Sequence, residues 1–203
     1  MEPFANVSRR RSLWGLSLGA MTLSVAGLFW FGYALWHLGQ PALWIILLGA
    51  FALLIVGSLR VRRKADGYRR PTLATLEPVQ RLEAQAHARQ WLWINGGQTL
   101  GCAGSAWGAS YFHHPELTWA LIALVVSLHF VALGRVFRTP TYLGTGGFGV
   151  GVSLWAILAL NGSARFLFLG AGMGIVNWLS AIYFLWNADD LADKEVAANL
   201  TAT

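Results

Sequence analysis

The sequence predicts an all-α membrane protein, a polytopic bundle of six transmembrane helices arranged as three antiparallel hairpins. Three observations lead to this prediction. Charged residues make up only 12% of the 203 residues and hydrophobic residues 56%, whereas soluble domains carry about 25% charged residues. Six apolar segments have roughly the length of about 20 residues that a membrane-crossing helix needs. All but one of the 15 Lys and Arg residues fall on one side of the resulting topology.

The six predicted spans follow one another with three short connections, residues 37–41, 113–116 and 161–165, on the side opposite the termini. Short connections force consecutive helices into antiparallel hairpins. Residues 1–12 form a basic amino terminus, residues 13–186 the membrane domain, and residues 187–203 an acidic, alanine-rich tail. The spans are approximately Leu13–Trp36, Ala42–Leu59, Trp91–Phe112, Leu117–Leu133, Leu143–Leu160 and Phe166–Trp186.

Each span has its own sequence features. The first follows a run of three arginines and is longer than the 7–15 apolar residues of a cleaved signal peptide, so we expect it to be retained. The second and fourth begin just after Pro41 and Pro115 and end at arginines, and the third carries polar residues among its apolar ones. The fifth is rich in glycine, and the sixth ends at the acidic tail. Between the second and third spans, the cytoplasmic connection 60–90 has a helical apolar pattern. It predicts either an amphipathic surface helix or an extension of the third span.

The basic residues predict the orientation, because Lys and Arg are retained on the cytoplasmic side during insertion. Arg165 is the one basic residue that falls in an outer connection. Both termini are therefore expected in the cytoplasm, in a multi-pass cell membrane protein. This distribution accounts for the formal charge of +6 without nucleic acid as a partner, since anionic lipid headgroups would face these residues.

Polar side chains inside the spans are the candidate functional residues. All nine Asp and Glu residues lie in loops, tails or membrane edges, which disfavours a carboxylate-driven antiporter. The intramembrane polar residues that we single out are uncharged or titrate near neutrality: Asn95, Gln98, His129 and Asn177. They predict either a polar cavity open to the cytoplasm or hydrogen bonds that hold the helices together. No catalytic constellation, cofactor or nucleic-acid site is indicated, and an enzyme is not expected.

Two further sets of residues have lesser roles in the prediction. A metal site at the outer face is not expected, although imidazoles and a carboxylate suited to zinc or nickel lie there at similar depth: His37, His113, His114 and Glu116. Small residues spaced by four allow helices to approach closely, and we expect them to place the first, third, fifth and sixth spans in the interior. The glycine pairs are Gly15 and Gly19, Gly97 and Gly101, Gly147 and Gly151, and Gly170 and Gly174.

The stretch Ser127-Leu128-His129-Phe130-Val131-Ala132-Leu133-Gly134-Arg135-Val136-Phe137, with Asn95-Gly96-Gly97-Gln98 before it, resembles a pattern in small bacterial six-helix membrane proteins of unknown function. In that family the fourth helix carries His-Phe, then Pro-Leu and a basic-aromatic end; Ala132 stands here where proline is expected. The resemblance implies a six-helix bundle in a bacterial inner membrane and supplies no activity.

Two functions are compatible with these features. The leading prediction is a small transporter-like or solute-binding membrane protein whose cavity is lined by the four polar residues. The alternative is a structural or accessory membrane subunit without transport activity, whose polar residues only join its helices. The sequence leaves open whether a second copy or another protein is the partner.

Overall fold

The computed structural model describes residues 2–40, 42–68, 78–136 and 140–201, and nearly all of them are helical. Pro41 before the second span, the basic residues Arg69 and Arg70 of the 60–90 connection, and Phe137 and Arg138 after the fourth span lie outside these ranges. The helices are α1 (Glu2–Leu38), α2 (Leu43–Asp66), α3 (Pro78–Tyr111), the short 3₁₀ helix η2 (Pro115–Leu117), α4 (Thr118–Val136), α5 (Pro140–Ala159), α6 (Gly162–Trp186) and α7 (Ala188–Thr201).

Five of the described helices are long and apolar enough to cross a membrane: the part of α1 from Ser12, α2, η2 with α4, α5 and α6. They agree with the predicted multi-pass membrane protein. The third predicted span falls on α3, which is not among the five. Polar residues such as Asn95 and Gln98 lower its hydropathy, and its membrane crossing therefore stays a prediction. α3 also runs unbroken from Pro78, so residues 78–90 extend this helix.

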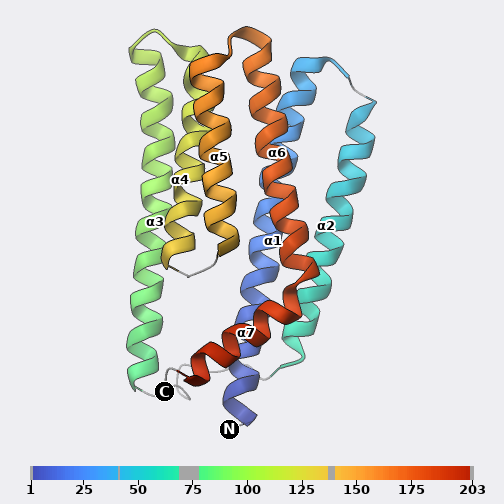
Figure 1. Cartoon of the computed structure of the whole chain (residues 1–203), viewed down its shortest axis with the longest axis vertical. Coiled ribbons are helices and arrows are strands. Elements are labelled where there is room, and N and C mark those ends of the chain that lie inside the picture. The colour runs from blue at the N-terminus through green and yellow to red at the C-terminus, as the bar shows by residue number, and fades with distance from the viewer. Residues whose placement is uncertain (1, 41, 69–77, 137–139, 202–203) are drawn as a thin grey trace.

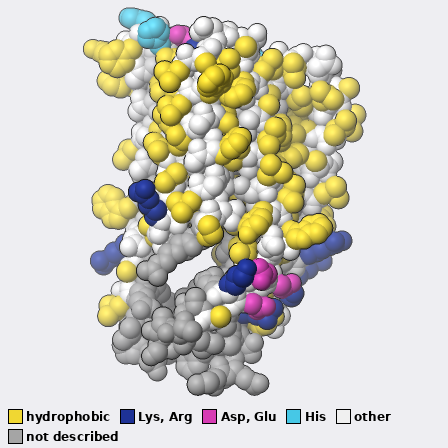
Figure 2. Space-filling model, viewed as in Figure 1, with side chains coloured by type: hydrophobic (Ala, Val, Ile, Leu, Met, Phe, Trp, Pro, Cys, Tyr) yellow, Lys and Arg dark blue, Asp and Glu magenta, His cyan; other side chains and the backbone are white. Residues whose placement is uncertain are grey.

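The long helices stand side by side in the order α3, α4, α5, α6, α1, α2 (Figure 1). The most extensive contacts join α1 to α6 and α4 to α5, and α1 also packs against α2. Both termini lie at one end of the bundle (Figure 1), which we call the terminal end; the opposite end is the distal end. Figure 2 shows hydrophobic side chains along the body of the bundle and Lys and Arg side chains towards the terminal end.

Glycines explain the close approach of α6 to α1. A methyl group at Gly170 would lie 2.7 Å from the carbonyl oxygen of Trp30, and one at Gly174 would lie 2.7 Å from the ring of Phe31. Gly19 is similarly close to the Tyr142 hydroxyl. These glycines face neighbouring helices, as a small-residue interface requires.

The other predicted packing glycines divide between contact and open space. Gly101 faces Val125 of α4. A Cβ atom added at any of four other glycines would have no neighbouring atom within 4 Å: Gly15, Gly97, Gly147 and Gly151. The expectation that α3 lies in the interior is wrong, because α3 packs mainly against α4 at one edge of the row. Glycine spacing by itself does not say which helix face meets a neighbour.

The acidic tail forms α7, which crosses the terminal end of the bundle (Figure 1). α7 packs against α1, where the fully buried side chains of Leu13, Ala65 and Ala192 form a small apolar cluster with Ala188. This cluster fixes the carboxylates of α7 beside the basic ends of α1 and α2.

Candidate functional site

Three of the four predicted polar residues lie at or near the contact between α3 and α4. The imidazole Nδ1 of His129 lies 3.4 Å from the carbonyl oxygen of Ile94 on α3. Asn95 follows in the chain, and its side-chain Nδ2 donates a hydrogen bond to the carbonyl of Trp91 on its own helix at 2.8 Å. Gln98 lies one turn further along α3 and is half-buried. His129 thus contacts α3 directly, and Asn95 and Gln98 are half-buried residues of α3 near this contact.

Asn177 lies in a different helix interface. Its side chain is fully buried in α6, which packs chiefly against α1 and α5. The Nδ2 group donates a 2.7 Å hydrogen bond to the carbonyl of Met173, one turn earlier. The Oδ1 atom is buried without a hydrogen-bond partner among the described residues. A buried acceptor without a partner is uncommon, and this makes Asn177 the most unusual of the four.

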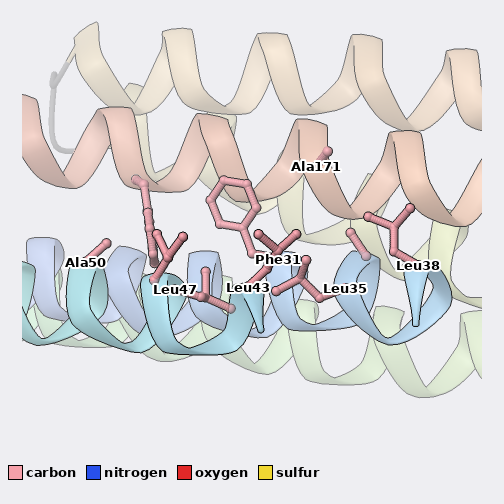
Figure 3. Close-up of a pocket in the computed structure, with 10 residues that line it drawn as sticks. Phe31, Leu35, Leu38, Leu43, Leu47, Ala50 and Ala171 are labelled. Carbon is pink, nitrogen blue, oxygen red and sulfur yellow. The ribbon is translucent and has the colours of Figure 1, made fainter. Parts of the chain in front are cut away.

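Two open hollows lie between the described helices, and neither is lined by any of the four residues. The first, about 270 Å³, lies between α1, α2 and α6; its lining includes Phe31, Leu35 and Leu47 (Figure 3). The whole lining is apolar apart from the indole of Trp178. The second, about 350 Å³, lies between α3, η2 and α4 and is lined in part by Ser105 and His114. Such apolar hollows suit hydrocarbon better than a polar solute.

The histidines of the distal end have other partners. Within the described ranges, no three His, Cys, Asp or Glu residues come together in a group that could hold a metal ion. The ring of His37 stacks on Phe166 with 4.5 Å between ring centroids. The Nδ1 atom of His114 lies 3.0 Å from a carboxylate oxygen of Glu116. Ring stacking thus engages His37, and a side-chain contact joins His114 to Glu116.

Hydrogen bonds between helices are more numerous than we predicted from the sequence. The Ser17 hydroxyl on α1 donates to the carbonyl of Ser58 on α2 at 2.8 Å. The indole N–H of Trp178 on α6 donates to the carbonyl of Ser24 on α1 at 3.0 Å. Hydroxyls on α5 and α6 also meet, at Thr145 and Ser180. Serine, threonine and tryptophan are too common in membrane helices for their sequence to reveal such pairs.

Arg165 is a buried anchor that sequence reasoning assigned only to a loop. Its side chain is 5% exposed, and Nε donates to the carbonyls of Ala156 and Leu160, both at 2.9 Å. The terminal nitrogens reach the Asn161 side chain at 3.2 Å and the carbonyl of Glu116 at 3.5 Å. A cation beside the last carbonyls of a helix is favourable. The sequence pattern that could have indicated this role is a basic residue just after the end of the fifth span.

Ion pairs connect α7 with the terminal ends of α1 and α2. Arg9 lies 2.9 Å from Asp193 and 3.7 Å from Asp189, and Lys64 also pairs with Asp189. On α7 itself, Lys194 binds Asp190 at 2.8 Å, and this hydrogen bond raises the pKa of the lysine. The acidic tail thus neutralises part of the basic surface of this end.

The described helices therefore combine many exposed apolar side chains with separate internal hydrogen bonds between helices and with ion pairs at the terminal end. No family model matches the chain, and neither a curated protein nor a solved structure matches it.

Proposed function

We propose that this chain is a six-span structural or accessory membrane subunit without transport activity of its own. The observation that carries the proposal is the way the intramembrane amides are used. Asn95 and Asn177 each donate a side-chain hydrogen bond to a carbonyl one turn earlier in their own helix, and His129 lies against a carbonyl of α3. These contacts use the polar groups within the protein, and separate hydrogen bonds between helices, from Ser17 to the carbonyl of Ser58 and from Trp178 to the carbonyl of Ser24, hold the bundle together.

In the proposed placement α3 also crosses the membrane, which brings the number of spans to six. The six spans form three hairpins, and both termini lie in the cytoplasm. The common position of the two termini at one end of the bundle (Figure 1) supports an even number of crossings. The basic residues around Arg60 and Arg135, at the same end, support its cytoplasmic location. The resemblance of the fourth span to bacterial six-helix proteins favours a bacterial inner membrane.

Reporter tags test this placement directly. A tag inserted between Arg60 and Arg89 is expected to be protected in sealed cells, and one inserted next to Gly162 is expected to be accessible. Accessibility of the first tag from outside the cell would contradict the topology, whatever the protein does.

Uptake into reconstituted vesicles tests the absence of transport. Wild-type protein is expected to give no more uptake of a broad solute panel than protein-free vesicles. His129→Ala is expected to leave that background unchanged. Saturable uptake by the wild type, reduced by His129→Ala, would overturn the proposal in favour of a carrier.

A solute-binding protein is the second candidate, and one observation favours it. The buried Oδ1 of Asn177 has no hydrogen-bond partner among the described residues and could accept a hydrogen bond from a solute or water. Asn177→Leu removes this acceptor, together with the Nδ2 donor, and keeps the same branching of side-chain heavy atoms. If a solute stabilises the wild type against heat but not this variant, the second candidate is supported; if no solute in the panel stabilises the wild type, it is not.

A further inference from the structure

The basic residues near the terminal end of α2 divide into a neutralised and an unneutralised set. Lys64 points towards α7, where it pairs with Asp189. Arg10 of α1 pairs with Asp66 at the end of α2 at 3.2 Å. In contrast, Arg60 and Arg63 are exposed and have no acidic partner among the described residues. Arg60 and Arg63, together with the exposed Arg62, therefore keep their full positive charge.

The helical spacing shows on which side of α2 Arg60 and Arg63 lie. Leu53, Val56, Arg60 and Arg63 follow one another at intervals of three, four and three residues, the spacing of one helix face. Leu53 and Val56 are 74% and 46% exposed. The opposite side of α2, which includes Ser58, is buried. This face therefore looks away from the bundle, with an apolar part that continues directly into two arginines.

We propose that this face of α2 binds an anionic phospholipid, with the phosphate between Arg60 and Arg63 and an acyl chain along Leu53 and Val56. The proposal rests on the membrane placement given under Proposed function. Arginine suits this role because its planar guanidinium makes paired hydrogen bonds to phosphate oxygens. A basic residue next to an apolar face matches the charge and the shape of a lipid at the cytoplasmic surface.

Arg62 borders this site without belonging to the same face. Its guanidinium lies 5.4 Å from the centroid of the Trp14 ring on α1, a cation–π geometry. This contact holds Arg62 beside α1. The phosphate is accordingly assigned to two arginines rather than to the whole basic segment.

The test uses the full chain purified in detergent, with bound lipids counted by native mass spectrometry. Dioleoyl phosphatidylglycerol is the anionic probe, dioleoyl phosphatidylcholine the zwitterionic one, and inorganic phosphate in large excess a competitor. The wild type is expected to retain phosphatidylglycerol in preference to phosphatidylcholine. The double variant Arg60→Gln/Arg63→Gln is expected to weaken phosphatidylglycerol binding by about tenfold or more.

A charge-matched control separates a local site from general attraction. Arg89→Gln/Arg135→Gln removes the same charge from exposed residues on α3 and α4 and is expected to keep the preference. Arg60→Lys/Arg63→Lys keeps the charge without the planar donors, and an intermediate loss is expected. Far-ultraviolet circular dichroism establishes that each variant retains the helical content of the wild type.

Three outcomes would overturn the proposal. They are an equal loss in both glutamine variants, no preference for phosphatidylglycerol in the wild type, and complete displacement of the lipid by inorganic phosphate, which would indicate a site for the free anion. Failure of the membrane placement is distinguishable, because it would be seen as intact chain that stays soluble and monomeric without detergent.

Discussion

Replacement of Arg165 by alanine is expected to destabilise the distal end of the bundle more than any loss of a surface charge. The guanidinium joins the carbonyls of Ala156 and Leu160, at the end of α5, to α6. It also reaches the carbonyl of Glu116 in η2. Alanine would leave these carbonyls without this donor, including the carbonyl of the buried residue Ala156.

The magnitude follows from the contacts. Hydrogen bonds from a charged donor contribute about 1.5–3 kcal/mol each. The single Nε–H is shared between the carbonyls of Ala156 and Leu160, and a terminal nitrogen makes a second bond to the Asn161 side chain, so these two bonds set an upper range of roughly 3–6 kcal/mol. Part of this is offset because the variant no longer buries a charge. We expect a net loss of about 3 kcal/mol in the free energy of unfolding for Arg165→Ala. Arg165→Lys should lose about half, because an ammonium keeps the favourable position at the end of α5 without the branched donors.

Thermal unfolding in detergent, followed by circular dichroism, measures this effect. A loss of about 3 kcal/mol corresponds to a decrease in Tm of roughly 6–12 °C for a chain of this size. Arg89→Ala, on the exposed side of α3, is the control and should stay within about 0.5 kcal/mol of the wild type.

Topology does not confound this experiment. Removal of a positive charge from the predicted outer side strengthens the positive-inside bias, so a lower Tm would report the lost hydrogen bonds. Equal Tm values for Arg165→Ala and the wild type would refute the anchor role, and so would a loss in the control as large as that in Arg165→Ala.

Three other substitutions test the packing and the polar contacts, each by the same thermal measurement unless another is named. Gly170→Ala should lower the free energy of unfolding by about 2 kcal/mol because its methyl group meets the α1 backbone. Gly147→Ala places its methyl group in open space and should be neutral or slightly stabilising. Equal effects of the two variants would contradict the close approach of Gly170 to α1. Ser17→Ala removes one hydrogen bond between α1 and α2 and should cost no more than about 1 kcal/mol, so a much larger loss would show that this bond had been undervalued. Asp189→Asn/Asp193→Asn should loosen α7 and speed its cleavage by protease modestly at low salt, because the lost ion pairs with α1 and α2 are partly exposed and each contributes less than about 1 kcal/mol. Unchanged cleavage would mean that apolar packing alone holds α7.

Much of the helical content could be predicted from hydropathy. Apolar segments such as Phe166–Trp186 match a described helix closely, because a chain in lipid must satisfy its own backbone hydrogen bonds. The sixth span on α3 stays a prediction, because polar residues such as Asn95 and Gln98 lower the hydropathy of this helix and it is not among the five helices that are long and apolar enough to cross a membrane. The extension of α3 back to Pro78 was one of two alternatives that the amphipathic pattern allowed.

The candidate site was harder to predict than the helices. The sequence identified Asn95, His129 and Asn177 as unusual, but it could not say that His129 faces α3 while Asn177 faces another interface. Depth in the membrane follows from residue number along a helix, whereas the rotation of each helix about its axis depends on its neighbours. That rotation decides which polar groups meet.

Composition and the placement of charge alone determined that this chain is built from long apolar helices and which connections are basic. Both follow from local rules, the length that lipid requires and the cost of carrying Lys and Arg across it. Only the tertiary structure decided that α1 packs closest to α6, that α3 lies at an edge, and that Arg165 is buried. These depend on contacts between segments far apart in the chain, such as Gly170 with Trp30, and no local pattern contains both partners.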